Sequence, residues 1–235
     1  MGHPGSMTTL SRDTGDAGGP LVVPPGVYPP QEDTFLLAEA LDREPLRPGA
    51  DVLDVGTGGG ALALAAARRG ARVTAVDTAW RAVLATRLNA ALARLDVEVL
   101  HGDLLTPAAG RRFDLIVTNP PYVPSPGGQP PRGGPARAWD AGRDGRALVD
   151  RICAGAAALL RPGGALLLVH SAVCGVDSTL ERLALGGLGT AVTDRRWIPF
   201  GPVMRSRAQW LEDQGLIAPG QEKEELVIIR ACRPQ

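Results

Sequence analysis

The chain is poor in the residues that build disulfides, metal sites and membrane spans. Its three cysteines (Cys153, Cys174 and Cys232) are far apart and form no C-x-x-C pair, which excludes a disulfide framework and a cysteine zinc site. Three histidines are too few for a metal centre, so no metal is expected. No run of 18 apolar residues and no secretory signal is present. We therefore predict a cytoplasmic protein with no membrane segment.

An excess of charge of either sign is also missing. The 25 basic and 25 acidic residues give a formal net charge of zero. A dedicated nucleic-acid-binding protein usually carries a basic excess, so a nucleic-acid partner is possible but not favoured. All the basic residues except Lys223 are arginines. This bias, with abundant Ala, Gly and Pro, is read as the mark of a GC-rich genome rather than of phosphate recognition.

Short apolar runs alternate with amphipathic segments along most of the chain. This alternation predicts a parallel sheet with helices on both faces, and a chain of 235 residues suffices for one domain of ordinary size. The last strand, helix and strand predict an antiparallel hairpin at the sheet edge. Strands are predicted at 52–55, 72–76, 97–101, 113–118, 165–170, 190–197 and 225–230, and helices at 32–42, 61–69, 79–94, 145–160, 178–185 and 204–214.

The tetrapeptide Asn119-Pro120-Pro121-Tyr122 follows the apolar run at 113–118. Two prolines forbid a helix here and fix a corner at the carboxyl end of a strand, where open α/β sheets bind ligands. The Asn119 amide oxygen and the Pro120 carbonyl can accept both hydrogens of a planar amino group. Tyr122 can pack on the flat face of that group. We predict that these three residues are catalytic and grip a conjugated nitrogen that is to be alkylated.

A second motif, Asp54-Val55-Gly56-Thr57-Gly58-Gly59-Gly60, lies between the first strand and its helix. Gly56 and Gly58 allow a ligand to approach the backbone closely, and Asp77 ends the next strand where it can accept from ribose hydroxyls. These glycines also satisfy the G-x-G-x-x-A dinucleotide fingerprint, so they leave an NAD-binding oxidoreductase open.

Two further acids favour S-adenosylmethionine over a dinucleotide. Asp54 lies directly before the turn, where a carboxylate suits an ammonium group and would repel a pyrophosphate. Asp103 follows the third strand and can accept from an adenine amino group, with Leu104 against the ring. Together with the corner at Asn119, which is also a predicted cofactor contact, these positions indicate S-adenosylmethionine as the cofactor and S-adenosylhomocysteine as the product.

With these motifs in order, the chain resembles class I S-adenosylmethionine-dependent methyltransferases, and more narrowly the short branch of the HemK family of protein glutamine N5-methyltransferases. The likeness runs from Val27 to Arg230 and includes the lead-in 27–37 and the segment 138–146. It implies a seven-stranded, mostly parallel Rossmann-like sheet in a domain of residues 21–235, after an expression scar and disordered tail at 1–20. The family usually has paired glycines where this chain has Asp140-Ala141-Gly142.

The resemblance implies methylation of a protein glutamine in the Gly-Gly-Gln motif of a class 1 release factor. It also implies a small zinc-binding partner that activates the enzyme at a sheet edge. The corner motif is shared with enzymes that methylate adenine N6 or guanine N2, so a nucleic-acid base stays an alternative acceptor, as does a small molecule in secondary metabolism. The sequence does not decide the acceptor, the need for a partner or the oligomeric state.

Of four other features, the first two keep two interpretations each. Tyr28 and Thr34 either close over the cofactor or only pack an amphipathic helix. The segment Pro124–Gly142 is either a lid or a passive linker, and Trp139 is expected to anchor it. Its tripeptide Gly127-Gly128-Gln129 matches the family's substrate motif, which we attribute to coincidence in a glycine-rich chain.

Overall fold

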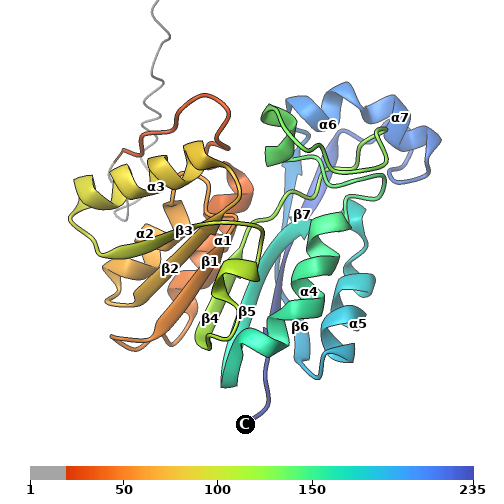
Figure 1. Cartoon of the computed structure of the whole chain (residues 1–235). Coiled ribbons are helices and arrows are strands. Elements are labelled where there is room, and N and C mark those ends of the chain that lie inside the picture. Colours follow the sequence, from red (N-terminus) through yellow and green to blue (C-terminus); the bar gives the residue numbers. More distant parts are fainter. Residues whose placement is uncertain (1–19) are drawn as a thin grey trace, which may run out of the picture.

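The sheet has seven strands in the order β3-β2-β1-β4-β5-β7-β6 (Figure 1). The computed structural model describes residues 20–235, so the predicted scar and tail at 1–20 lie, except for Pro20, outside the described residues. Strands β1 to β5 are parallel, and β7 is antiparallel to both β5 and β6. The predicted sheet and its antiparallel edge hairpin are confirmed. The strands are β1 (Asp51–Val55), β2 (Arg72–Asp77), β3 (Val97–His101), β4 (Phe113–Thr118), β5 (Leu160–Ser171), β6 (Gly189–Pro199) and β7 (Lys223–Cys232).

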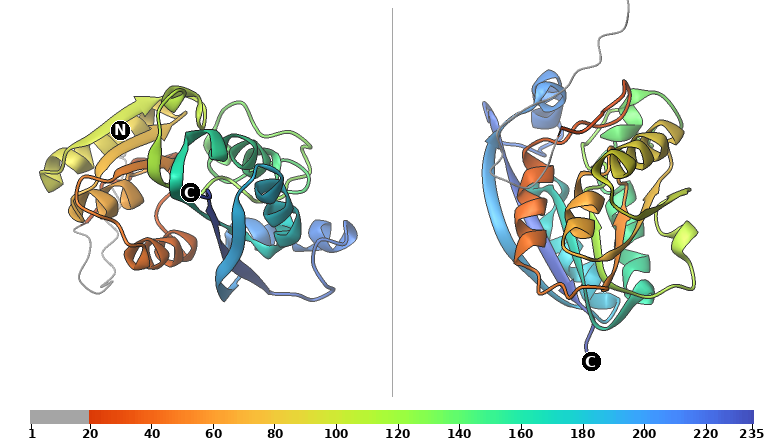
Figure 2. Two further views of the ribbon diagram at one scale, coloured as in Figure 1. Left: turned by 90° about the horizontal axis from the view of Figure 1, so that it is seen from below. Right: turned by 90° about the vertical axis from the view of Figure 1, so that its left-hand side faces the viewer.

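Helices cover both faces of this sheet. The chain moves from β1 to β3 in one direction and from β4 to β5 in the other, so right-handed crossovers place α2 and α3 on one face and α4 on the opposite face. Figure 2 shows the β6–β7 hairpin at one edge of the molecule and β3 at the other. The helices are α1 (Glu32–Arg43), α2 (Ala61–Arg68), α3 (Trp80–Ala93), α4 (Ala147–Leu159), α5 (Val176–Leu185), α6 (Pro202–Ser206) and α7 (Ala208–Asp213), with short 3₁₀ turns η1 (Thr106–Ala108), η2 (Pro135–Ala138) and η3 (Ala172–Cys174).

Two elements differ from the prediction by more than a shift of one or two residues at an end. The single helix predicted at 204–214 is wrong, because α6 and α7 are separate helices that meet at Arg207. The Arg207 N–H donates to the Met204 carbonyl, three residues back, and its φ of −108° turns the chain there. Strand β5 begins at Leu160 rather than at 165. The chain there pairs with the C-terminal residues, since Gly163 N–H donates to Arg233 O and Arg233 N–H to Gly164 O, each at 2.9 Å.

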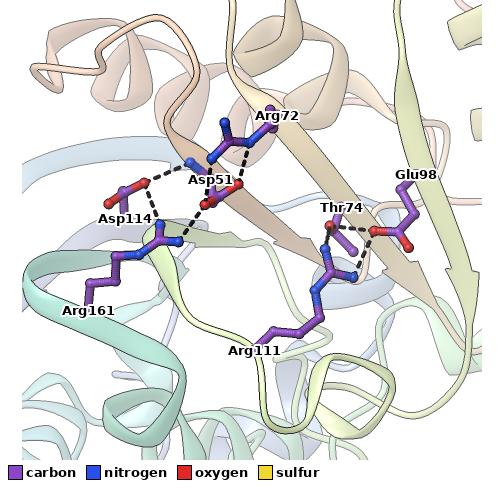
Figure 3. A network of polar contacts seen from close by, with 7 residues as sticks. All are labelled: Asp51, Arg72, Thr74, Glu98, Arg111, Asp114 and Arg161. Atoms are coloured by element: carbon purple, nitrogen blue, oxygen red, sulfur yellow. Dashed lines mark hydrogen bonds and ion pairs between the residues drawn. The ribbon is translucent and has the colours of Figure 1, made fainter.

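The amino ends of four strands are tied together by charged groups (Figure 3). Asp51 at the start of β1 accepts two hydrogen bonds from Arg72 of β2, at 2.8 and 2.9 Å. Arg161 of β5 reaches Asp51 at 2.6 Å and Asp114 of β4 at 2.7 Å. The Arg72 hydrogen bonds, followed by Arg161, lower the pKa of Asp51 to about 2. This network lies at the edge of the sheet opposite the carboxyl ends of the strands.

We expect Asp51→Asn to lower the free energy of unfolding by about 1 kcal/mol at pH 7, since both arginines are largely exposed and water screens the ion pairs. The pKa of Asp51 is lower in the folded than in the unfolded protein, so its contribution is complete above about pH 4 and is lost as the pH falls toward 2. Urea unfolding at pH 7 and pH 3 measures this. The exposed Asp96, changed to Asn, is the control, and an equal loss at both pH values in Asp51→Asn would contradict the assignment.

Candidate functional site

A cavity of about 810 Å³ opens at the carboxyl ends of β1, β2 and β4. Because the strand order reverses between β1 and β4, the turns that follow these neighbouring strands lead away from each other and leave a crevice. The two predicted motifs, which are 60 residues apart in the chain, therefore share one wall. The cavity is lined by parts of segments 26–34, 56–62, 77–82, 103–104, 119–123 and 130–140, together with Leu148 and Arg151.

Asp54 stabilises the glycine turn, residues 56–60, through two hydrogen bonds. Its Oδ2 accepts from the Thr57 hydroxyl at 2.6 Å and from the Ala63 N–H at 3.0 Å. Asp54 is fully buried and does not line the cavity, so the structure places it beneath the turn rather than on the wall. Its Oδ1 has no hydrogen-bond partner among the described residues. Burial, with a smaller effect of Asp77, raises the pKa of Asp54 to about 7.

Asp77 fixes the other side of the turn and lines the cavity. One carboxylate oxygen accepts from Gly58 N–H at 3.0 Å and the other from Ala79 N–H at 2.8 Å. Burial raises the pKa of Asp77. Each oxygen keeps a free lone pair, so the carboxylate can still accept from two hydroxyl groups of a ligand. The contact of Asp77 with a ribose stays a prediction.

The last glycine of the turn has no room for a larger side chain. Gly60 has a φ of +88°, and a Cβ there would lie 2.9 Å from atoms of both Leu64 and Thr86. The turn is further held by Thr86, whose hydroxyl donates to Gly58 O, and by Asn89, whose Nδ2 donates to Gly59 O at 2.8 Å. The role of Asn89 in holding the turn was not predicted.

At the corner after β4, the Asn119 side chain is oriented by a hydrogen bond. Its Nδ2 donates to the Thr34 hydroxyl at 3.2 Å. Because the nitrogen is engaged by Thr34, the Oδ1 is left as the acceptor. The Pro120 carbonyl accepts no hydrogen bond from the part of the chain that the structure describes. Both residues line the cavity, so two acceptors are available beside one another.

A buried carboxylate joins the corner to the lead-in. Asp33 Oδ2 accepts from the hydroxyls of Tyr122 and Tyr28, at 3.0 Å each, while Oδ1 accepts from the Thr34 N–H at 2.6 Å. Burial, and then the Asp33 charge, raises the pKa of both tyrosines, so both are phenols at neutral pH. The sequence did not single out Asp33; the only signal was an acid in the first turn of α1 close to an aromatic residue.

Glu224, at the start of β7, is a second buried acid near this group and was not predicted either. It is 5% exposed, and its Oε2 has no partner among residues 20–235. Burial raises the pKa of Glu224 to about 7, and the Asp33 charge acts in the same direction. The site thus concentrates four buried or half-buried carboxyl groups, those of Asp33, Asp54, Asp77 and Glu224.

Two residues just after β3 line the cavity, but the acid among them is already paired with an arginine. Asp103 lines the cavity, but it is exposed and both its oxygens lie near Arg151, at 2.5 and 3.3 Å. Leu104, with a φ of +47°, lines the same part of the wall. An adenine amino group would therefore share Asp103 with Arg151.

The segment Pro124–Gly142 covers one side of the cavity. Its residues 130–140 supply much of the lining, and Arg137 donates to the Thr78 hydroxyl at 2.6 Å, beside Asp77. The Trp139 carbonyl accepts from Val123 N–H, so the main chain of Trp139 anchors the returning end. The Gly127-Gly128-Gln129 tripeptide does not line this cavity.

The described residues contain neither a candidate metal site nor a membrane-spanning helix. Among residues 20–235 no group of three or more His, Cys, Asp or Glu side chains could hold a metal ion. Within the same residues, no helix has the length and apolar character needed to cross a membrane.

Comparison with known proteins gives consistent matches. The family described as "Methyltransferase small domain" matches residues 21–127. The MJ0928 protein of Methanocaldococcus jannaschii, named as a protein N5-glutamine methyltransferase, is 32% identical over 77% of this chain and 90% of its own length. The release factor glutamine methyltransferases of Deinococcus radiodurans and Mycolicibacterium smegmatis are 45% and 39% identical, over 60% and 75% of this chain. The chain spans only 53% and 66% of those two proteins.

Two solved structures extend the comparison. One is the Encephalitozoon cuniculi (E. cuniculi) Mtq2–Trm112 complex, which is described as responsible for methylation of the termination factor eRF1. It contains a chain that is 27% identical to this one. The TM-score is 0.61, and the match covers 88% of this chain and 99% of that one. The Thermus thermophilus (T. thermophilus) 16S rRNA N2 G1207 methyltransferase RsmC, in complex with AdoMet and guanosine, is 26% identical, with a TM-score of 0.60 over 91% of this chain and 47% of that one. The match to the archaeal relative covers most of this chain and nearly all of that protein, and the fold agrees with that of the E. cuniculi chain. The chain therefore belongs to the HemK family of protein glutamine N5-methyltransferases, within the class I methyltransferases.

Proposed function

We propose that this protein transfers the methyl group of S-adenosylmethionine to the side-chain amide nitrogen of a protein glutamine, in the Gly-Gly-Gln motif of a class 1 release factor. The observation that carries the proposal is the orientation of Asn119, whose nitrogen is bound to Thr34 and whose oxygen is left free beside the Pro120 carbonyl. The names of the bacterial and archaeal relatives support the acceptor.

The residues present fit S-adenosylmethionine. Asp54 Oδ1 is a buried carboxylate oxygen without a partner in the described part of the chain, and the cofactor's ammonium group, bound on the cavity side of the glycine turn, would offset its charge. Gly56 and Gly58 leave the backbone open to the ligand, and Asp77 has free lone pairs for ribose hydroxyls. When bound, the cofactor supplies an activated methyl group on a sulfonium.

The chain's own residues have one main task, the alignment of the amide nitrogen. A glutamine amide is a poor nucleophile, because its lone pair is delocalised into the carbonyl group. Asn119 Oδ1 and the Pro120 carbonyl would each accept one N–H hydrogen, which holds the nitrogen in line and stabilises the positive charge that develops on it. Tyr122, held by Asp33, would pack against the amide plane. The nitrogen held by Asn119 and Pro120 would take the methyl group that the cofactor supplies, which would leave the cofactor as a neutral thioether, and would release one proton to water.

A nucleic-acid base is the second candidate acceptor, because RsmC shares the fold and is described with bound guanosine. Four arginines line the cavity, but three are occupied within the protein. Arg137 donates to Thr78, Arg151 pairs with Asp103, and Arg81 donates to Pro25 O. A basic strip for phosphates is thus not available among these side chains, and the protein acceptor is favoured. A small-molecule acceptor has no observation in its favour.

A small activating partner is proposed at the β3 edge. Among the described residues β3 pairs only with β2, and α3 beside it carries an apolar stripe at four-residue spacing. Trp80, Leu84, Leu88 and Leu92 are 59%, 60%, 46% and 65% exposed. The related E. cuniculi chain is found in a complex with Trm112, and a partner of that kind would bury the stripe.

Asn119→Ala should lower kcat about 100- to 1,000-fold, since it removes one of the two oxygens that align and stabilise the nitrogen. The Kd for S-adenosylmethionine should change less than threefold, because the glycine turn and Asp77 are held by other bonds. Transfer of labelled methyl to a release factor gives kcat, and calorimetry gives Kd. Asn119→Asp keeps an acceptor oxygen and should lose less. Equal losses of turnover and cofactor affinity would rule out the role assigned to Asn119.

The affinity for S-adenosylmethionine should rise as the pH increases from 6 to 7.5. Asp54 has a pKa of about 7 in the free protein, and only its ionised form neutralises an ammonium group. The expected gain is roughly eightfold, from the change in the ionised fraction of Asp54. Asp54→Asn should bind more weakly and lose most of this dependence, which separates Asp54 from Asp77 and Glu224. The same pH dependence in Asp54→Asn would show that another group is responsible.

The paired change Leu84→Arg and Leu88→Arg should abolish binding of a Trm112-type partner while the fold is kept, because it places two charges in the apolar stripe. Sedimentation of the protein mixed with the E. cuniculi Trm112 chain is the measurement. Leu185→Arg, at an 87% exposed leucine of α5, is the matched control. Self-association that the same pair of changes abolishes would instead identify the stripe as an interface between two copies of this chain.

A further inference from the structure

The segment between β6 and β7 forms a small helical unit above the carboxyl ends of the strands. It contains α6 and α7, which lie over the segment Pro124–Gly142 in Figure 1. Met204 and Leu211 of these helices are buried, as are the flanking Phe200 and Ile217. The unit is therefore packed into the main core and forms a rigid support beside the cavity.

One side chain connects this support to the loop. Arg207, at the junction of α6 and α7, donates through Nη1 to Asp140 Oδ1 at 2.6 Å and to the Pro124 carbonyl at 2.9 Å. The two side chains are only 19% and 11% exposed, so water screens this pair less than the surface pairs. Pro124 and Asp140 lie near the two ends of the loop, and a single guanidinium holds both.

The loop ends lie directly after the corner that would bind the acceptor. Val123 N–H donates to Trp139 O at 2.8 Å, Ala141 N–H to Val123 O at 3.0 Å, and Ser125 N–H to Gly142 O at 2.8 Å. Val123 follows Tyr122 in the chain, and Asp140 is its bridge partner. A shift of these ends would move the Tyr122 ring and the loop wall together.

Apart from the bonds at its two ends, few contacts fix the backbone of the loop Pro124–Gly142. Gly127, Gly128, Gly133 and Gly134 leave the backbone free, and at the last three a Cβ would meet nothing within 4 Å. Besides the bonds at its ends, Arg137 reaches Thr78, and Arg143 just beyond the loop donates to Gln214 at 3.2 Å. Without the Arg207 bonds, Asp140 would be a nearly buried carboxylate with no cation, which favours a shift of the loop toward water.

We propose that Arg207 is a positioning residue for the methyl acceptor: through Asp140 and the Pro124 carbonyl it fixes both ends of the loop that walls the acceptor side of the cavity. Arg207 touches neither the glycine turn nor Asp77, and its bonds are made at Pro124 and Asp140, next to the acceptor corner. The loop reaches the cofactor side separately, through the bond from Arg137 to Thr78, so the larger effect of Arg207 is expected on the acceptor. The inference rests on the proposed function for the identity of the acceptor, but the effect on the loop is independent of it.

The test compares the wild-type protein with Arg207→Ala and Arg207→Lys, using a release factor as the acceptor. In Arg207→Ala the KM for the release factor should rise about tenfold or more, because a displaced wall misaligns the acceptor. The Kd for S-adenosylmethionine should change less than threefold. Arg207→Lys keeps a cation for Asp140 but reaches fewer acceptors, so its KM should be intermediate.

Arg230→Ala is the matched control. Arg230 pairs with Glu44 at 2.6 Å with similar burial, and neither residue lines the cavity. This variant should lose comparable stability without a change in the KM for the acceptor. If Arg207→Ala and Arg230→Ala raise that KM equally, or if Arg207→Ala weakens cofactor binding as much as acceptor binding, the positioning role is wrong.

Hydrogen exchange provides a readout that does not depend on the acceptor. In Arg207→Ala the amides of Val123, Ser125 and Ala141 should exchange at least tenfold faster, while those of the glycine turn stay unchanged. Unchanged exchange at the loop ends would overturn the inference even if activity falls. If the wild-type protein fails to methylate a release factor but the exchange result holds, the proposed acceptor is wrong and the loop-fixing role of Arg207 stands.

Discussion

The reversal of strand order between β1 and β4 is the constraint on which the site depends. Both strands are parallel neighbours, with Val55 beside Thr118, so the glycine turn and the Asn-Pro-Pro-Tyr corner emerge at the same level of the sheet. The Thr118 hydroxyl donates to Val55 O and ties the two strand ends together. A ligand that lies along the glycine turn therefore presents its far end to Asn119 without any domain movement. In the proposed mechanism, the pairing of β1 with β4 therefore places the cofactor beside the acceptor.

Buried negative charge gives this site its selectivity. Asp33, Asp54 and Glu224 are buried, and within residues 20–235 none of them pairs with a cation. Such an arrangement costs stability unless protons or a positive ligand compensate. The raised pKa values of Asp54 and Glu224 reflect the free-energy cost of burying their charged forms. A cationic cofactor relieves it, whereas a pyrophosphate would increase it. The dinucleotide alternative that the glycine pattern left open is thus disfavoured by the charges around the turn as well as by the family.

Much of the fold could be predicted from the sequence, because most strands are short apolar runs and most connections carry Gly or Pro. The corner and Asp77 could be predicted because they follow strands directly. Asp33 could not, since its importance comes from two tyrosines, 5 and 89 residues away, that meet only in the folded chain. Glu224 was missed for the same reason. Asp54 was predicted as a ligand contact, but an acid that holds a turn and one that faces the ligand have the same sequence pattern.

The lead-in and α1 have a larger part in the site than an amphipathic helix alone would suggest. Thr34 orients Asn119, and Asp33 holds Tyr122, so adjacent residues of the first turn of α1 set both side chains of the acceptor corner. Arg207 reaches the far side of the same corner through Pro124 and Asp140. The corner is thus contacted by α1 on one side and, through Pro124 and Asp140, by the α6–α7 unit on the other. A prolyl corner is stiff in its own backbone, but the direction of its side chains is decided by these two supports. Variation in either support can therefore change which acceptor fits while the four corner residues stay the same.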